Sequence, residues 1–421
     1  MKRFFSILAA LLLVFSLFSF ALGEDDLSGH IVYWSIWNET EPNAQWMQSA
    51  MNSFTELHPG VTFECVWNGR QNAATVNAAL AAGQHIDMFD GNVQVAYATN
   101  SEYLIPVTKY FDEAYPTTDG KAYKDCVLPA FASMCRQIAN SEDIYMFCYA
   151  PSAYMFFYNK DIFDDCGIEK APDTWQDFLD TCQILKDHGY TAIATDDAYA
   201  YRMLGVYLTY MLGNDYVVDL VNSGISEKWS APEVVAAVKE MEGLVQKGYY
   251  APGQASNPYP SVQQEMVIEG NIAMYYNGTW LPNEVSASAG PDFRWGEFAF
   301  PTLEGAAFGK NYGGYASMGV NITKDCECPD AVAAFIAYLT TSDYDSLYAV
   351  QCFGIPISNN GVWPDSLQDA KAVFENYDSW FLSGSMIASN AELLPTLQDC
   401  CIRLLSGTMT SDEFVKVMSG Q

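Results

Sequence analysis

The most informative segment of the chain reads Glu265-Met-Val-Ile-Glu-Gly-Asn-Ile-Ala-Met-Tyr-Tyr-Asn-Gly-Thr-Trp280. It predicts the end of a helix, a buried strand from Ile272 to Tyr276, and a turn at Asn277-Gly278. The turn is followed directly by Trp280. This indole can form the floor of a site for a polar, ring-shaped ligand, or it can cap the edge of a sheet inside the core. The local sequence leaves both interpretations open.

The residues on the N-terminal side alternate between strand and helix patterns. Such alternation predicts an α/β fold with a mostly parallel sheet. Ligands of these sheets bind beyond the carboxyl ends of the strands, which here selects the loops 38–42 and 90–92. The predicted elements are a strand at 31–37, a helix ending at 57, a strand at 61–67, a helix at 76–82 and a strand at 86–89.

The rest of the chain continues in the same manner. Two apolar runs, 144–149 and 153–158, predict two strands joined by Ala150-Pro-Ser152, and the segment 311–315 predicts a flexible turn. Capping residues predict helix starts at Thr174, at Ser230-Ala-Pro-Glu233 and at Thr410-Ser-Asp-Glu413. Further strands are expected at 191–195, 295–300 and 316–322, and a further helix at 330–339.

Composition sets the class of protein. The 421 residues carry a formal net charge of −31, which argues against nucleic acid or an anionic membrane as a partner. It also disfavours an anionic ligand, although a local pocket can differ from the general surface. With 50% hydrophobic and 14% aromatic residues, the chain can form a large core, and its length indicates two domains or lobes.

The N-terminus has the features of an export signal. Lys2 and Arg3 precede an apolar run from Phe4 to Leu22, and small residues favour cleavage before Glu24. No Cys follows this run, so the usual bacterial lipid attachment site is missing. We therefore expect an exported protein, extracellular or at the cell surface or in the periplasm.

The chain contains eleven Cys, an odd number, so at least one thiol is free or pairs between chains. The close pairs are Cys326-Glu-Cys328 and Cys400-Cys401, and neither has the spacing of a zinc site. The four His are not near these pairs in sequence. We expect most of the Cys to be small core residues, with one or two disulfides of undetermined connectivity, and no metal site.

No sequence signature of an enzyme is present. The chain lacks the G-x-S-x-G elbow, the phosphate-binding loop, the dinucleotide fingerprint and the H-E-x-x-H zinc motif, so we expect no catalysis and no cofactor. Glu39 and Glu41 form a close carboxylate pair. A glycosidase needs carboxylates on both sides of the scissile bond, which two acids in one loop rarely achieve. They fit better as acceptors for sugar hydroxyls or as solvated loop acids.

A binding constellation remains. Aromatic side chains suit the apolar faces of sugar rings, and Asn, Asp and Glu suit their hydroxyls, although peptides and other polar ligands can use the same groups. Such side chains lie in predicted loops or at strand ends. They are Trp37, Asn38, Glu39, Glu41, Asp90, Asn92, Tyr154, Asn277, Trp280, Tyr312, Tyr315 and Asn390.

Two blocks of sequence resemble a known family. Tyr158-Asn-Lys-Asp-Ile-Phe163 with Gly167, Pro172 and Thr174-Trp175 is similar to "Y-N-K-D-x-F…G…P-x-T-W", and Gly270–Trp280 is similar to "G-x-A-A-M-x-x-x-G-x-W". These are motifs of the bacterial extracellular solute-binding proteins, family 1, which include the maltodextrin-binding protein. Weaker similarities lie at 54–63 and at 81–89, where Ile86 replaces the usual Pro.

The resemblance implies a two-lobed α/β fold of the periplasmic-binding-protein type II, with ligand held in a cleft that closes by hinge motion. It implies lobe crossings near Cys148, Phe300 and Asp343, so that 24–147 with 300–343 forms an N-lobe and 148–299 with 344–421 a C-lobe. Trp280 becomes the stacking platform of the C-lobe. The N-lobe loops supply hydrogen bonds, and Tyr312, Gly313 and Tyr315 complete the rim.

The resulting hypothesis is a monomeric, non-enzymatic protein that binds a mono- or oligosaccharide and delivers it to the membrane permease of an ABC importer. Two alternatives stay open. One is a binding protein for a non-sugar solute such as a peptide or polyamine. The other is an exported carbohydrate-active enzyme, which requires two carboxylates on opposite walls of the cleft.

Overall fold

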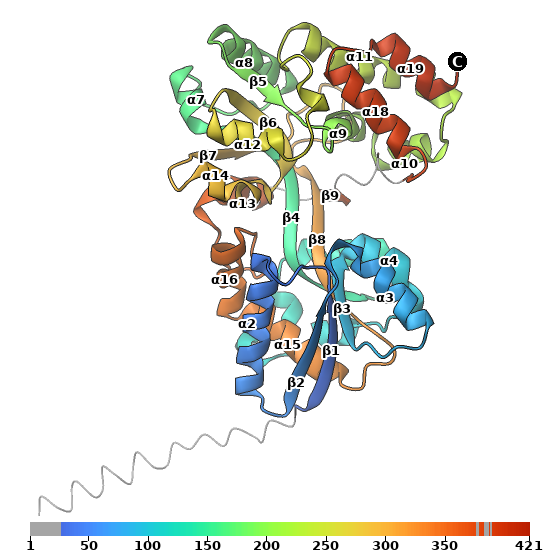
Figure 1. Ribbon diagram of the computed structural model, residues 1–421, viewed down its shortest axis with the longest axis vertical. Coiled ribbons are helices and arrows are strands. Elements are labelled where there is room, and N and C mark those ends of the chain that lie inside the picture. Colours follow the sequence, from blue (N-terminus) through green and yellow to red (C-terminus); the bar gives the residue numbers. More distant parts are fainter. Residues whose placement is uncertain (1–26, 376–378, 383–386, 388–389) are drawn as a thin grey trace, which may run out of the picture.

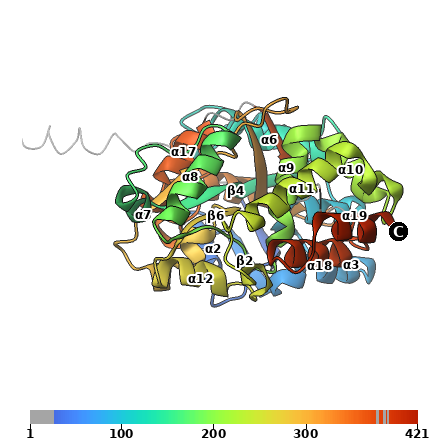
Figure 2. The ribbon, with the colours of Figure 1, turned by 90° about the horizontal axis from the view of Figure 1, so that it is seen from above.

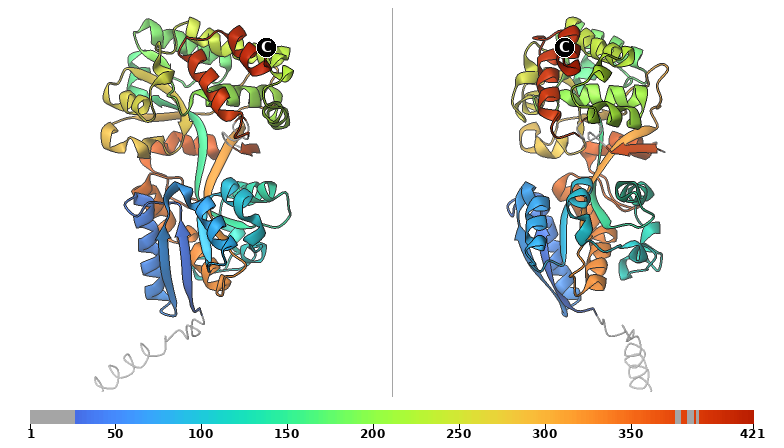
Figure 3. Two further views of the ribbon diagram at one scale, coloured as in Figure 1. Left: turned by 45° about the vertical axis from the view of Figure 1, so that its right-hand side comes forward. Right: turned by 90° about the vertical axis from the view of Figure 1, so that its right-hand side faces the viewer.

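The computed structural model describes residues 27–375, 379–382, 387 and 390–421. The expected signal segment, with its cleavage position before Glu24, lies outside these residues. The described chain forms a lower and an upper lobe connected by two long strands (Figure 1). Figure 3 shows the same separation from two further directions.

The lower lobe begins with the predicted strand–helix alternation. Strands β1 (Gly29–Ser35), β2 (Val61–Trp67) and β3 (Met88–Asn92) pair in parallel in the order β2-β1-β3. Helix α2 (Pro42–Leu57) starts with Pro at its first position, and its apolar residues Trp46, Ala50 and Phe54 are buried at helical spacing. The helices α3 (Asn72–Ala81), α4 (Val93–Asn100), α5 (Thr108–Phe111), α6 (Pro129–Ala139), α15 (Pro329–Thr341) and α16 (Asp343–Cys352) complete this lobe.

Two antiparallel strands, β4 (Met146–Asn159) and β8 (Tyr312–Ile322), run through both lobes (Figure 1). The two strands predicted at 144–149 and 153–158 are therefore one strand, with a bulge between Cys148 and Ala150. Pro151 fits within it because β4 pairs only with β8 at this point, so one side of the strand needs no hydrogen-bond donor. The turn predicted at 311–315 is also wrong, since Tyr312 onward belongs to β8.

The upper lobe extends the sheet from β4. The strands β6 (Ile272–Gly278) and β7 (Trp295–Phe298) pair antiparallel with β4, and β5 (Thr191–Ala194) pairs in parallel with β6. A further strand, β9 (Ser379–Leu382), pairs with β8. Seen from above, α8, α11, α12 and α18 are arranged around β6 (Figure 2).

The helices of the upper lobe start largely at the predicted residues. Thr174 forms a capping box with Asp177, and Thr410 forms one with Glu413. The capping box predicted at Ser230 is not formed, because the helix begins one residue later, after Ala231. The helices are α7 (Lys160–Asp165), α8 (Trp175–Asp187), α9 (Ala200–Leu212), α10 (Asn214–Asn222), α11 (Pro232–Gln246), α12 (Ser261–Ile268), α13 (Leu281–Glu284), α14 (Ser286–Ala289), α17 (Gln368–Glu375), α18 (Leu394–Leu405) and α19 (Ser411–Ser419).

The lobes do not divide where the sequence placed the later boundaries. Helix α16 packs on α2 of the lower lobe, with the rings of Tyr348 and Trp46 4.9 Å apart. The lower lobe thus continues past the boundary expected at Asp343. Phe300 is 1% exposed within the upper-lobe core, so the second crossing is made by β8 and not at residue 300. The crossing expected near Cys148 coincides with the bulge of β4.

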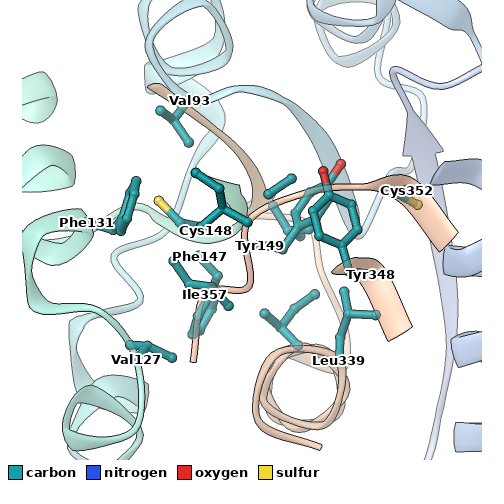
Figure 4. Packing of buried hydrophobic residues seen from close by; sticks show 14 of the residues in the cluster. Val93, Val127, Phe131, Phe147, Cys148, Tyr149, Leu339, Tyr348, Cys352 and Ile357 are labelled. Carbon is teal, nitrogen blue, oxygen red and sulfur yellow. The ribbon is translucent and has the colours of Figure 1, made fainter. Parts of the chain in front are cut away.

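The core of the lower lobe is built around β4. Figure 4 shows Phe147, Cys148 and Tyr149 of β4 packed between side chains of several helices, with Tyr348 and Cys352 of α16 nearby.

All eleven cysteines are free thiols, contrary to the expected disulfides. In the described part of the chain, no helix has the length and apolar character that crossing a bilayer requires.

Candidate binding cavity between the lobes

An open cavity of about 600 Å³ lies where the two lobes face each other. Its volume suits a ligand of small-molecule size. The lower lobe contributes the loop after β1 and the start of α2, and the upper lobe contributes α9 and the turn after β6. Residues 150–152 of β4 and 316–318 of β8 form the floor between them.

A buried hydrogen-bond network fixes the lower wall. Trp37 donates from Nε1 to the hydroxyl of Tyr149 at 2.8 Å, and Tyr149 donates to Asp90 at 2.6 Å. Asp90 also accepts from the Tyr33 hydroxyl and from the Ile36 amide, at 2.8 and 2.7 Å. Burial raises the pKa of Asp90, and these hydrogen bonds oppose the rise. Asp90 therefore acts on the cavity indirectly, by holding the indole of Trp37 in place.

An ion pair covers the outer face of the same indole. The Arg70 guanidinium carbon lies 4.9 Å from the centroid of the Trp37 ring, and its Nη2 lies 2.6 Å from Oε2 of Glu41. Glu41 also accepts from the Asn38 amide at 2.9 Å. Burial alone would raise the pKa of Glu41, but the hydrogen bonds from Arg70 and Asn38 outweigh it and lower the pKa. Glu41 is thus an ionised acceptor whose charge is already balanced.

The upper wall is built around Trp280. The turn after β6 is docked on β4 by a hydrogen bond from the Thr279 amide to the Ala153 carbonyl at 3.0 Å. A Cβ at Gly278 would lie 2.3 Å from the Trp280 ring, so only glycine lets the indole lie on the end of the strand. Trp280 then meets Tyr154 edge to face at 4.9 Å and donates from Nε1 to the Tyr199 hydroxyl at 3.1 Å.

A cationic side chain lies behind these rings. The Arg202 guanidinium is 4.7 Å from the ring centroid of Tyr154 and 5.0 Å from that of Tyr199. Its Nε has no hydrogen-bond partner among the described residues, and the titratable side chains that most affect its pKa are neutral tyrosines. Arg202 lines the cavity, and its guanidinium also hydrogen-bonds the side chain of Tyr154.

A second carboxylate, Glu284, lines the cavity on the upper side, opposite Glu41. It accepts hydrogen bonds from the Tyr259 hydroxyl and from Nε2 of Gln263. Desolvation by the surrounding protein raises the pKa of Glu284, although the side chain as a whole reaches solvent, and these hydrogen bonds oppose the rise.

Several residues predicted from the sequence come together here, and together they make both walls aromatic and polar. Those that line the cavity are Trp37, Glu41, Asn92, Tyr154 and Trp280. Trp37 and Glu41 come from the loop after β1, Asn92 from the end of β3, Tyr154 from β4 and Trp280 from the turn after β6.

Other predicted residues lie elsewhere. Asp90 and Asn277 are fully buried, and Asn277 hydrogen-bonds Gln263 and the Gly278 amide. Asn38 supports Glu41 without lining the cavity, and Glu39 lies in a separate surface hollow. We therefore remove these four from the contact surface.

The predicted rim at 312–315 does not border the cavity either. Tyr312 stacks on Phe308 at 3.7 Å, and Gly313 pairs with residue 380 of β9. Tyr315 is 2% exposed and stacks on Phe374 at 4.7 Å. Asn390 accepts from the Leu393 amide in the turn before α18 and donates to the Val221 carbonyl, so it fixes that turn. These residues hold the upper lobe together rather than form a ligand surface.

The sequence did not reveal Arg70, Tyr199, Arg202 or Glu284 as cavity residues. Tyr199 and Arg202 lie at the start of a mostly apolar helix, where such side chains usually belong to its core-facing side. The available signal was a cation beside two tyrosines within 199–202, without an acid at helical spacing. The packing of the upper lobe brings α9 to the turn after β6, and only this packing places the cation at the cavity.

Comparison with known sequences identifies the kind of protein that has this arrangement. A family model described as bacterial extracellular solute-binding protein matches residues 37–345. A protein of Brucella abortus described as a binding protein is 22% identical over 252 residues, or 58% of this chain. The match spans only 55% of that relative's own length.

Solved structures share the fold over nearly the whole chain. A chain from Caldanaerobius polysaccharolyticus, described in work on xylan utilization, has a TM-score of 0.69 at 18% identity and covers 93% of this chain and 99% of its own. An ABC substrate-binding protein from Listeria monocytogenes in complex with cycloalternan has a TM-score of 0.63 at 17% identity, with coverage of 93% and 97%. At these identities the likeness establishes the two-lobed fold.

Proposed function

The chain belongs to the bacterial extracellular solute-binding protein family, and we propose that it binds a mono- or oligosaccharide in the cavity between its lobes and delivers it to the permease of an ABC importer. The structural neighbours described with xylan utilization and with cycloalternan support the ligand class. The export signal expected from the sequence is consistent with work outside the cytoplasm.

The observation that carries the proposal is the pairing of aromatic planes with polar groups on facing walls. Trp280 on the upper side offers an apolar face to a sugar ring, and the aromatic side chains Tyr154 and Trp37 line the upper and lower sides of the same cavity. Glu41, Arg70 and Arg202 lie beside them and can accept from or donate to hydroxyls. A pyranose has apolar faces and a polar rim, so it can use both kinds of group at once.

Ligand binding acts by favouring a closed arrangement of the lobes. The lobes are connected through β4 and β8, and the bulge in β4 gives a point at which the strands can bend. A ligand that contacts both walls binds the closed state better than the open state. Moving a protein from 1:99 to 99:1 in favour of closure requires about 5.5 kcal/mol of differential binding, which two aromatic contacts and several hydrogen bonds can provide.

A thermal-shift screen over mono- and oligosaccharides, short peptides and polyamines tests the ligand class. We expect at least one saccharide to raise the Tm in a concentration-dependent way. A polyamine is disfavoured because Glu41 is already paired with Arg70 and the cavity contains the further cation Arg202. Stabilisation by a peptide or polyamine alone would contradict the sugar assignment.

One observation favours carbohydrate cleavage as a second candidate. Glu41 and Glu284 line opposite walls, and their pKa values are shifted in opposite directions, as in glycosidases with one acid and one base. The bidentate pairing of Glu41 with Arg70 opposes this role, since it occupies the oxygens that would attack or activate water. Release of reducing ends by the wild type, abolished in Glu284→Gln, would establish the enzyme. Intact oligosaccharide after long incubation supports the binding protein.

A further inference from the structure

A cluster of potential metal ligands lies at the end of the lower lobe away from the cavity. A carboxylate oxygen of Asp87 and the Sγ atoms of Cys326 and Cys328 all lie within 4.8 Å of one another. Asp87 directly precedes β3, and the two cysteines lie between β8 and α15. Asn92 at the end of β3 and its partner Met318 of β8 line the cavity, whereas Asp87 precedes β3 and the cysteines follow β8, so the cluster lies at the other end of this antiparallel pair.

The carboxylate at the centre of this cluster is fully buried. Asp87 accepts from the Val32 amide at 2.8 Å and from the Glu327 amide at 3.2 Å. A side chain that can carry a positive charge, His85, lies beside it, with its Nε2 3.2 Å from Oδ2 of Asp87. Among the described residues no Lys or Arg forms an ion pair with Asp87. A buried carboxylate without a cation is costly, and a bound cation relieves that cost.

The two thiols are held in position by packing. A Cβ on Gly29 of β1 would lie 2.6 Å from Sγ of Cys328, so the cysteine loop lies directly on the strand. Both cysteines are half-buried, and His85 is exposed, so an ion can enter from solvent. The cluster is thus assembled before any ion arrives, and it is accessible.

We propose that Cys326, Cys328 and Asp87 bind one divalent cation of the zinc class, and that His85, which lies outside this three-residue cluster but beside Asp87, turns toward the ion as the fourth ligand. Thiolate sulfur selects zinc-like ions and disfavours calcium and magnesium, which prefer oxygen ligands. In a tetrahedral zinc site with metal–sulfur bonds of about 2.3 Å the ligand atoms lie within about 4 Å of one another. The present spacing needs only small shifts to reach that geometry.

Binding of the metal ion releases the protons of the two thiols. Two S–H bonds break, two metal–sulfur bonds form, and two protons pass to the buffer. The ion would link the start of β3 to the loop before α15. It would therefore stabilise the lower lobe without touching the ligand cavity. The sequence interpretation missed this site because the ligands come from segments about 240 residues apart in the chain.

Titration of reduced, chelator-stripped protein with Zn²⁺ in the absence of oxygen tests the proposal. We expect one ion per chain by calorimetry, about two protons released per ion, and a Tm raised by several degrees. Titration with Co²⁺ should produce the charge-transfer absorption of thiolate-bound cobalt. The double variant Cys326→Ser/Cys328→Ser should lose all three signals, whereas Cys126→Ser, a half-buried thiol outside the cluster, should keep them.

Three results would overturn the assignment. The first is a reduced wild type that binds neither ion. The second is a double variant that binds Zn²⁺ as tightly as the wild type. The third is a Cys326–Cys328 disulfide in the isolated protein whose reduction restores no metal binding. Unchanged affinity in His85→Ala would overturn the fourth ligand alone.

Discussion

Replacement of Trp280 by alanine is the most informative perturbation of the cavity. Its indole lies on Gly278, meets Tyr154 edge to face and donates a hydrogen bond to Tyr199. These contacts fix the plane of the ring before ligand binds. Alanine removes the apolar platform and leaves the polar side chains of the lower wall intact.

The expected loss of affinity follows from the area of the platform. A sugar ring stacked on one face of an indole covers roughly 100 Å², about half of what a Trp buries in a core. At about 25 cal/mol per Å² this corresponds to about 2.5 kcal/mol. The dissociation constant of Trp280→Ala should then be roughly 60 times that of the wild type, since each 1.4 kcal/mol is tenfold.

Calorimetric titration with the best saccharide from the screen measures this effect, and circular dichroism verifies the fold. Trp175→Ala is the matched control, because Trp175 is also a half-buried indole of the upper lobe, packs on Phe178 at 4.9 Å and does not line the cavity. The control should lower the Tm and leave affinity unchanged. A folded Trp280→Ala protein that binds within twofold of the wild type would refute the stacking argument.

Three further predictions concern buried or half-buried charges. Arg202→Met should weaken saccharide binding at least tenfold by calorimetry, because charged hydrogen bonds contribute about 1.5–3 kcal/mol; equal affinity would exclude Arg202 as a donor. Asp90→Asn should lower the free energy of unfolding in urea by about 1–3 kcal/mol, since an amide cannot satisfy all its donors; an unchanged midpoint would contradict the network. Burial raises the pKa of Glu297 from 4.5 to about 8, so its contribution to stability is full below its ordinary pKa and is lost as pH rises through about 8. The free energy of unfolding, measured by urea denaturation, should therefore fall less for Glu297→Gln than for the wild type between pH 5 and 9. Parallel pH curves for the two proteins would argue against the raised pKa.

Local patterns in the sequence were sufficient for most elements of the fold. Strand β2 begins and ends at the predicted residues, and α2 follows the helical spacing of its buried apolar side chains. The failures occurred where tertiary pairing overrides local signals. Pro151 reads as a break between strands, yet one side of β4 is unpaired at that point, and a single long strand results. The glycines of 312–315 likewise read as a turn but lie in β8.

The candidate site was predictable only in part. Trp37 and Trp280 follow strands at the edge where α/β sheets bind ligands, and both line the cavity. Asp90 was expected in the loop after the strand at 86–89, but it lies within β3 and its carboxylate turns inward to Tyr149. A loop position identifies the edge of a sheet and does not fix the direction of a side chain. Arg202 lies within a helix, and only the packing of α9 against the strand ends brings it to the cavity.

A crystal structure of the protein with the saccharide that stabilises it most is the direct test of the account. We predict a sugar ring between the lobes, stacked on Trp280, within hydrogen-bonding distance of Glu41 or Arg70 of the lower lobe, and with the lobes closer together than without ligand. A saccharide bound outside this cavity, or one that contacts a single lobe and leaves the lobes apart, would contradict it.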